Sequence, residues 1–415
     1  MSGRRHQSTL EALLDTTRLL WPAPACSRVD GALPRGHRVV RDYVLLPGRR
    51  QPRLALPVHD PRVAAKVLQK YSQGLSAAER AVRTTFSRLV AFPAVNRTLT
   101  TLAPHRLSVS VPAGHQVESL ETHLAQLLDS EVVISVGVGR PRANRKPVVH
   151  VLDPEGRSLA FVKVGTSPLT RELVRGEADA LRSYWSVGPH ENLVAVPRIL
   201  HHGSWRSLEL LVLSPVLPSA PRWRRRPDVP TAAMRELGVR LGTTRCALDR
   251  SPMWADVRRT PAELGNREQA AAFERIVDAA QARFGSSPVT LGAWHGDWTP
   301  WNMAWDQDQV LLWDFERFAT GVPLGFDLAH YRLQSALRAE GERAAAQLIR
   351  ADLSTNARTG GHGAAEGDDP AAVRCAYLVE LTRRYVRASE PVEGTPLRAR
   401  TAWLLELLDE LVVRR

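Results

Sequence analysis

The sequence is poor in cysteine and has no long apolar stretch. Its three cysteines, in 415 residues, are too few and too widely spaced for a disulfide framework or a cysteine-based metal site. No run of about 18 apolar residues occurs, so we expect no membrane-spanning helix. The motifs GxxxxGK[ST], HExxH and GxSxG are also absent. The cysteine pattern and the lack of a long apolar run favour a soluble protein of the reducing cytoplasm.

Lysine is rare although the chain is strongly basic. The formal net charge is +13, and only four of the 56 lysine and arginine residues are lysine. The arginines are scattered, and one of their densest runs, Arg222–Arg226, is short. A nucleic-acid-binding protein is expected to gather its basic residues on one face or in one stripe. We therefore expect no specific nucleic-acid partner, and nucleic-acid binding is the weakest hypothesis for this chain.

Apolar spacing divides the chain into three parts. Residues 1–105 predict an accessory α/β extension, in which Arg38–Leu46 and Arg53–Val58 form a strand pair. Residues 106–213 contain three strands, a helix and two strands, an order that predicts a five-stranded antiparallel sheet with one packed helix. Residues 214–415 begin with a proline-rich linker and continue with mainly helical spacing, starting with Thr231–Leu248. The predicted fold is α+β with two lobes and an N-terminal extension.

Lys163 lies in an apolar strand, LAFVKVG, of the predicted sheet. Burying an ammonium group is costly unless its charge finds a partner, and Glu177 on the following predicted helix is a candidate. We interpret Lys163 as a contact for nucleotide phosphates that Glu177 orients. The alternative is a lysine at a strand end that extends to solvent. Gly137 and Gly139 form a turn whose N–H groups can cover phosphates, although a plain hairpin explains them equally well.

The stretch Trp294–Glu316 carries the strongest chemical signal. Asp297 is followed five residues later by Asn302, and Asp314 ends the next apolar strand. This spacing suits metal-assisted phosphoryl transfer, in which one acid orients the attacking hydroxyl group while an amide oxygen and a carboxylate hold Mg²⁺. We predict Asp297 as the catalytic base and Asn302 and Asp314 as metal ligands.

Three further polar residues in or near this stretch have weaker assignments. His295 precedes the predicted base by two residues and is a supporting residue. Glu316 either helps to bind the metal ion or hydrogen-bonds to the backbone. Asp327 begins a predicted helix, where it is either an ordinary N-terminal acid or a brace for the loop that contains Asp297.

The segments HGDWTPWN, LLWDFE and GFDLAHY resemble the aminoglycoside phosphotransferase and choline kinase superfamily, whose members are related to protein kinases. The HGDxxxxN spacing matches fully, and Lys163 and Glu177 match the family's phosphate-contacting lysine and its helix partner. The resemblance covers roughly residues 130–415. It departs at Arg142, where a GxGxxG loop has its third glycine, and at Cys246–Asp249, where relatives often carry Leu-His.

The resemblance implies a bilobal, protein-kinase-like fold and a small-molecule kinase. It implies a nucleoside triphosphate, ATP or GTP, held at Leu213, Ser214 and Val216, with Mg²⁺ as the second cofactor. The γ-phosphate would move to a hydroxyl group of a small-molecule acceptor. The alternative is a catalytically inactive kinase-like protein that binds nucleotides as a regulatory or biosynthetic partner. The sequence leaves the acceptor and the oligomeric state open.

Overall fold

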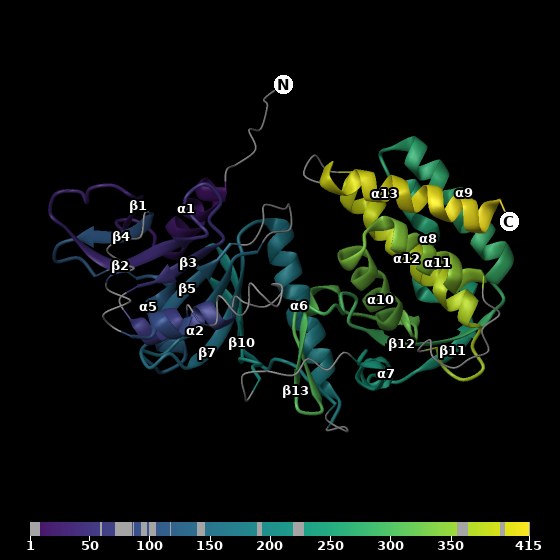
Figure 1. Ribbon diagram of the computed structural model, residues 1–415, viewed down its shortest axis with the longest axis horizontal. Helices are drawn as coiled ribbons and strands as arrows, with labels where there is room; N and C mark the ends of the chain where they lie inside the picture. Colours follow the sequence, from purple (N-terminus) through teal and green to yellow (C-terminus); the bar gives the residue numbers. More distant parts are fainter. Residues whose placement is uncertain are drawn as a thin grey trace. The chain divides into compact units, whose positions relative to one another are not determined.

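The computed structural model describes residues 9–58, 60–70, 85, 87–92, 98, 105–116, 118–138, 146–188, 193–218, 228–354, 364–390 and 395–414. The chain forms two compact units (Figure 1). Residues 1–178 and 198–215 form the first, which we call the sheet unit. Residues 179–197 and 216–415 form the second, which we call the helical unit.

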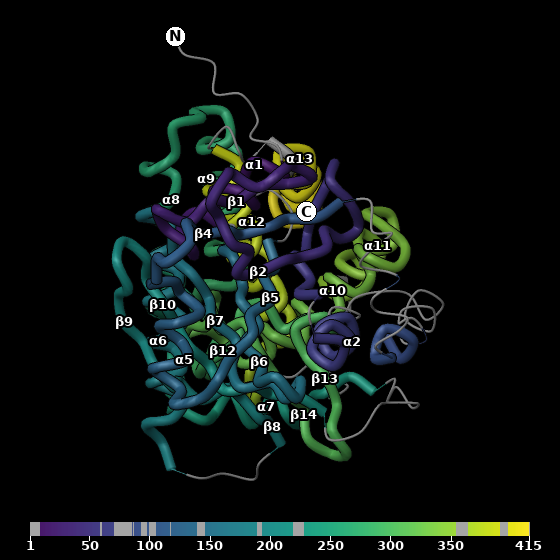
Figure 2. The backbone as a smooth tube through the Cα atoms, turned by 90° about the vertical axis from the view of Figure 1, so that its left-hand side faces the viewer, coloured from purple at the N-terminus to yellow at the C-terminus, as the bar shows by residue number. Residues whose placement is uncertain are grey.

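The sheet unit is built on one nine-stranded antiparallel sheet. The strand order is β1-β4-β2-β3-β5-β6-β7-β10-β9, and Figure 2 shows β5, β6 and β7 running beside one another. The strands are β1 (Cys26–Val29), β2 (His37–Leu46), β3 (Leu54–Pro57), β4 (Arg106–Pro112), β5 (Val133–Gly137), β6 (Val148–Leu152), β7 (Ser158–Gly165), β9 (Ile199–Trp205) and β10 (Leu208–Leu213).

Helices cover both faces of this sheet. The helices are α1 (Thr9–Leu20), α2 (Pro61–Lys70), α5 (Leu120–Leu127) and α6 (Pro168–Ser186), whose last residues belong to the helical unit. Alternation along β3 shows the two faces, because neighbouring side chains of a strand point to opposite sides. Leu54 and Leu56 pack with Val63 of α2, whereas Ala55 belongs to the core that α1 and α5 cover.

The sequence correctly predicted β5, β6, β7, β9 and β10 and their antiparallel arrangement, but the sheet that the described residues form has nine strands rather than five. The predicted strand pair of residues 38–46 and 53–58 is present as β2 and β3. It joins the predicted sheet through β3 and β5, where Leu54 pairs with Gly137. This pairing connects segments far apart in sequence, so local patterns do not reveal it. The functional division of the chain at residues 105 and 213 remains a prediction.

The helical unit combines α-helices with two three-stranded sheets. Its main core consists of apolar side chains from α8, α9, α10, α11, α12 and α13 and from strands β12 and β15. The helices are α7 (Thr231–Val239), α8 (Pro252–Glu263), α9 (Arg267–Phe284), α10 (Phe326–Ala339), α11 (Glu342–Ser354), α12 (Pro370–Ser389) and α13 (Thr395–Leu408), with short turns η1 (Leu248–Arg250), η2 (Phe315–Arg317) and η4 (Asp409–Val413). The strands are β8 (Val194–Ala195), β11 (Thr244–Ala247), β12 (Pro288–Trp294), β13 (Met303–Asp306), β14 (Gln309–Leu312) and β15 (Ala319–Pro323).

The helix predicted over Thr231–Leu248 ends earlier than expected. Helix α7 stops at Val239, and Gly242 follows with a φ of +87°. Glycine adopts this left-handed conformation readily, so it allows the chain to leave the helix. Residues Thr244–Ala247 then pair with β12 as strand β11. The prediction of a helix was therefore wrong for the second half of this segment.

Two general expectations concern the cysteines and a membrane-spanning helix. Cys26, Cys246 and Cys375 all carry free thiols. Within the ranges that the structure describes, no helix has the length and apolar character needed to cross a bilayer.

Candidate active site

Lys163 and Glu177 meet inside the sheet unit, as the sequence predicted. Lys163 lies on β7 and its Nζ donates to Oε1 of Glu177 on α6 at 2.6 Å. The side chains are 12% and 1% exposed, respectively. Val162 and Val164, the neighbours of Lys163 on β7, point into the opposite, apolar core. The alternation of the strand therefore directs the lysine toward α6.

The start of α6 is fixed by side chains that cap it. Oγ1 of Thr170 accepts hydrogen bonds from the N–H groups of Thr166 and Ser167 at 2.9 and 2.8 Å. Oγ of Ser167 accepts in turn from the N–H of Thr170. Such caps satisfy donors that have no partner within the helix. They fix where α6 begins and thereby help to place Glu177 opposite Lys163.

The other predicted nucleotide contacts lie at strand ends of the sheet unit or just beyond them. Gly137 ends β5 and pairs with Val148, whereas Gly139 lies outside the described residues. Leu213 ends β10, and Ser214 follows it with Oγ accepting from the N–H of Arg198 at 2.8 Å. Val216 is half-buried and is the first residue of this segment that belongs to the helical unit.

Asp297 lies in the loop between β12 and β13 of the helical unit. Its Oδ2 accepts from Nδ2 of Asn302 at 2.8 Å, so the two residues of the predicted HGDxxxxN pattern are in direct contact. Its Oδ1 lies 3.2 Å from Nε2 of His330. The Asp297 side chain is 36% exposed, although its two partners are buried. The carboxylate is thus held on one side and open to solvent on another.

His295 joins this loop to the segment that carries Asp314. Its Nδ1 accepts from the N–H of Asp297 at 3.3 Å, so Nε2 carries the hydrogen and donates to the carbonyl oxygen of Trp313 at 3.1 Å. Burial lowers the pKa of His295 from 6.5 to about 4, although Asp297 and Asp314 act in the opposite direction. The imidazole is therefore neutral near neutral pH and has a structural role.

Asp327 braces the same loop from the first turn of α10. Its carboxylate oxygens accept from the N–H groups of His295 at 2.8 Å and Gly296 at 3.1 Å. Burial raises the pKa of Asp327 from 3.8 to about 7, while these two bonds and Arg384 lower it. Of the two interpretations suggested by the sequence, the contacts correspond to the brace.

Gly296 is sterically required at its position. Its φ is +80°, and a Cβ atom there would collide with the carbonyl oxygen of Arg317. Its own carbonyl oxygen accepts from Nη1 of Arg384 on α12 at 2.8 Å. The guanidinium carbon of Arg384 lies 4.2 Å from the ring centroid of Trp294. The backbone of Gly296 is thus held from both α10 and α12.

Asp314 and Asn302 approach each other through the β13–β14 hairpin. Met303 pairs with Leu312, and one step further the N–H of Trp313 donates to the carbonyl oxygen of Asn302 at 3.2 Å. Asp314 follows with a φ of +75° and precedes η2, on which the half-buried Glu316 lies. An aspartate tolerates this left-handed backbone better than most residues do.

The donor set at Asn302 and Asp314 suits a hard cation. Because Nδ2 of Asn302 donates to Asp297, its amide oxygen Oδ1 is the atom left to bind a cation. Mg²⁺ usually takes one or two oxygen ligands from the protein and completes its shell with water and substrate phosphates. Across the described ranges, no cluster of three or more His, Cys, Asp or Glu side chains forms a metal site by itself. The two oxygen donors of Asn302 and Asp314 fit a Mg²⁺ site of this shared kind.

Three further residues near Asp297 were not predicted from the sequence: His330, Tyr377 and Arg384. His330 lies on α10, is 5% exposed, and has Nδ1 at 3.0 Å from the hydroxyl oxygen of Tyr377 on α12. His330 stands inside the GFDLAHY segment, and its position three residues after Asp327 was a usable signal. Tyr377 is separated from His330 by 47 residues and Arg384 from Gly296 by 88, so no local pattern connects them.

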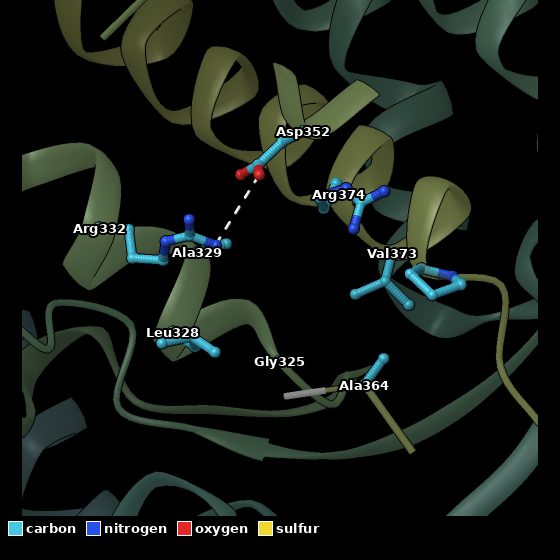
Figure 3. A pocket seen from close by; sticks show the side chains of 9 residues that line it. Gly325, Leu328, Ala329, Arg332, Asp352, Ala364, Val373 and Arg374 are labelled. Carbon is cyan, nitrogen blue, oxygen red and sulfur yellow. Dashed lines mark ion pairs between the residues drawn. The ribbon is translucent and has the colours of Figure 1, made fainter. Parts of the chain in front are cut away.

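A separate small pocket in the helical unit does not coincide with these residues. Figure 3 shows Arg332 and Asp352 facing each other across it, with Nη1 and Oδ1 3.8 Å apart. Its cavity volume of about 10 Å³ is close to the space of one water molecule. None of the predicted site residues is among the described residues that line it. It is too small for a small-molecule acceptor.

The sequence model of the phosphotransferase enzyme family matches residues 140–366, more than half of the chain. The chain belongs to this family. The match includes Lys163, Glu177, Asp297, Asn302 and Asp314, and it confirms the family resemblance. The expected α+β architecture, with an antiparallel sheet and a mainly helical second part, is also confirmed.

No curated protein matches the sequence significantly. Solved structures with a similar fold include aminoglycoside phosphotransferase APH(4)-Ia with AMP-PNP and hygromycin B, at 15% identity, 71% coverage of this chain, 98% of that chain and a TM-score of 0.47. The gentamicin complex of APH(2'')-IIa is 12% identical and has a TM-score of 0.38, with 70% of this chain and 94% of that chain covered. A protein of Haemophilus somnus 129PT assigned as a fructosamine-3-kinase is 14% identical and has a TM-score of 0.42, with 71% of this chain and 96% of that chain covered. Similarity at this level does not identify a substrate.

Proposed function

We propose that this family member is a Mg²⁺-dependent kinase that transfers the γ-phosphate of ATP or GTP to a hydroxyl group of a small molecule. The observation that carries the proposal is the geometry of Asp297. Its carboxylate is oriented by Asn302 and His330 and remains partly open to solvent. A general base needs such an orientation together with access to the proton that it accepts.

The acceptor oxygen forms a bond to the γ-phosphorus, and the bond between that phosphorus and the β–γ bridging oxygen breaks. The nucleoside diphosphate leaves with the electron pair of the broken bond. The hydroxyl proton passes to the carboxylate of Asp297. Because the transition state is loose, most of the rate gain in such reactions comes from positioning and electrostatic stabilisation.

The remaining roles follow from the contacts already described. Lys163, held by Glu177, contacts the nucleotide phosphates. Asn302 and Asp314 hold Mg²⁺, which neutralises phosphate charge when it is bound. His330 positions Asp297, because its ring contacts the carboxylate on one side and Tyr377 on the other. The carboxylate of Asp327 holds the loop by accepting from two of its backbone N–H groups, and Asp327 does not touch the substrate.

Acceptor-dependent nucleotide consumption tests the proposal. The purified full chain, Mg²⁺ and either ATP or GTP would be combined with a panel of hydroxylated metabolites and antibiotics. At least one compound should raise the release of nucleoside diphosphate above the background and should itself become phosphorylated. Nucleotide binding without phosphorylation of any acceptor would contradict this proposal and favour the inactive, nucleotide-binding alternative.

A further inference from the structure

Glu177 has a second positively charged neighbour, Lys146. The Nζ atom of Lys146 lies 3.8 Å from Oε2 of Glu177, while Lys163 contacts the other carboxylate oxygen, Oε1, at 2.6 Å. The side chain of Lys146 is only 6% exposed. We call Lys146, Lys163 and Glu177 the lysine cluster. It places two ammonium groups beside one buried carboxylate.

The register of β6 and β7 explains how the two lysines meet. Val148 of β6 pairs with Lys163 of β7, and the N–H of Val164 donates to the carbonyl oxygen of Pro147. The pairing thus extends one residue before β6 begins. Lys146 precedes Val148 by two residues, which places both on the same face of the sheet. Both lysines therefore lie near the end of the sheet where β6 begins and β7 finishes.

The choice of residue is unusual for this chain. Only four of its 56 basic residues are lysine, and two of these four share Glu177. An ammonium is a compact point charge, whereas a guanidinium is a planar group that prefers two-point contacts. An ammonium group has three N–H donors, so it can contact Glu177 and a further anionic group at the same time. A cluster of this composition is suited to a ligand with several negative charges.

The position of Lys146 relative to the predicted phosphate turn points to the same ligand. Gly137 ends β5, and Lys146 stands nine residues later in the sequence, two residues before β6 begins. In the sequence, Arg142 lies between them at the position of the third glycine of a GxGxxG loop. A glycine loop binds phosphates through backbone N–H groups. A lysine directly after the turn supplies a donor with a full charge for the same purpose.

We infer that Lys146 is a second phosphate-binding residue, which acts with Lys163 on the polyphosphate of the nucleoside triphosphate. This inference rests on the proposed function, because it presupposes a nucleotide substrate. Lys163 remains bound to Glu177 and contacts one phosphate group, while Lys146 contacts another. Lys146 contributes to binding, and the chemistry at Asp297 does not require it.

Binding measurements across a phosphate series test this role. Calorimetry in the presence of Mg²⁺ would measure the affinities of the wild type and of Lys146→Met for a nucleoside and for its mono-, di- and triphosphate. The variant should bind the triphosphate about 10- to 100-fold more weakly, as expected for loss of a hydrogen bond to a charged group. It should bind the unphosphorylated nucleoside as the wild type does. The phosphate at which the two proteins diverge is the one that Lys146 contacts.

Matched variants separate this role from a structural one. Lys146→Arg keeps the charge and should retain most of the triphosphate affinity, while Lys66→Met removes an exposed lysine on α2 and should change nothing. If Lys146→Met weakens nucleoside and triphosphate binding equally, Lys146 only supports Glu177 and the inference is wrong. The inference alone also fails if the wild type binds triphosphate and Lys146→Met binds it equally well. If the wild type binds no nucleotide, the proposed function itself fails.

Discussion

The two units hold their candidate site residues in different ways. In the sheet unit, the lysine cluster sets two ammonium groups against one buried carboxylate. In the helical unit, Asp297 is held by an amide and by an imidazole whose pKa is lowered by burial, although Asp297 itself raises it. We call Asp297, Asn302, His330 and Tyr377 the aspartate cluster. One cluster balances charge with charge, and the other orients a carboxylate with neutral groups.

This difference suits the two proposed tasks. Two neighbouring ammonium groups can donate to different phosphate groups of one nucleotide. A carboxylate in contact with a cation would be stabilised in its charged form and would become a weaker base. Neutral partners fix the direction of Asp297 while they cost it less basicity. The comparison predicts that variants of the lysine cluster change stability and nucleotide affinity, whereas variants of the aspartate cluster change turnover.

The largest expected stability effect is that of Glu177→Ala. The change leaves two buried ammonium groups without their shared carboxylate, and breaking a buried ion pair typically costs about 3–5 kcal/mol. The free energy of opening that hydrogen exchange reports for the β6 and β7 amides should fall by a corresponding amount. Glu172→Ala, an exposed position on α6, should leave these rates unchanged. Equal protection in both variants would show that Glu177 does not neutralise the lysines.

The helical unit should show opposing proton linkages at His295 and Asp327. The pKa of His295 falls from 6.5 to about 4 on folding, so this group makes the protein less stable as the pH drops from about 6.5 to 4. The pKa of Asp327 rises from 3.8 to about 7, so this group makes the protein less stable as the pH rises from about 4 to 7. In the wild type the two effects largely cancel between about pH 4 and 6.5.

Asp327→Asn removes one of these effects. The free energy of unfolding of this variant should rise with pH from about 4 to 6.5, because only the contribution of His295 remains there. Chemical denaturation at several pH values, followed by tryptophan fluorescence without nucleotide or metal, measures it. A variant whose pH dependence parallels that of the wild type would mean that Asp327 does not change its protonation on folding.

His330→Phe should lower turnover without weakening nucleotide binding. The variant loses the contact between Nε2 and Oδ1 of Asp297, which leaves the carboxylate less well oriented. We expect a fall in kcat of about tenfold, equivalent to about 1.4 kcal/mol, with the KM for nucleotide unchanged. His330→Gln keeps a donor near this position and should recover part of the lost rate. A rise in KM with constant kcat would assign His330 to binding instead.

The smallest effect is expected for Tyr377→Phe. This change removes the hydroxyl group that lies 3.0 Å from Nδ1 of His330 and leaves the ring in the core. Its influence on Asp297 is indirect, so kcat should fall only a few-fold. Combined with His330→Phe, the second change should add little, because the two residues act through one chain of contacts. Additive losses in the double variant would show that they act separately.

The sequence carried different amounts of information about the two clusters. Lys163 and Glu177 could be predicted because a strand and the helix that follows it fix their relation. Asp297 and Asn302 could be predicted because five residues of one loop separate them. Lys146 was missed because its role depends on the register between β6 and β7, which a single sequence does not reveal.

The fold shows the same division between local and distant information. The five strands around Lys163 follow from apolar runs and turns, whereas the extension of the sheet to nine strands depends on β3 pairing with β5. In the helical unit, Asp327 was recognised at a helix start. The partners on α12, Tyr377 and Arg384, act across 47 and 88 residues. Contacts of this kind are determined by tertiary packing.

The most direct test of Asp297 as the catalytic base compares wild type with Asp297→Asn, using an acceptor found in the screen. Phosphorylated product would be measured by mass spectrometry and nucleotide affinity by calorimetry. We expect kcat to fall by about 10²- to 10⁴-fold, the range for a lost general base, with nucleotide affinity unchanged. Asp278→Asn, an exposed position on α9, should behave as wild type. Undiminished phosphorylation by Asp297→Asn would contradict the assignment of Asp297 as the base.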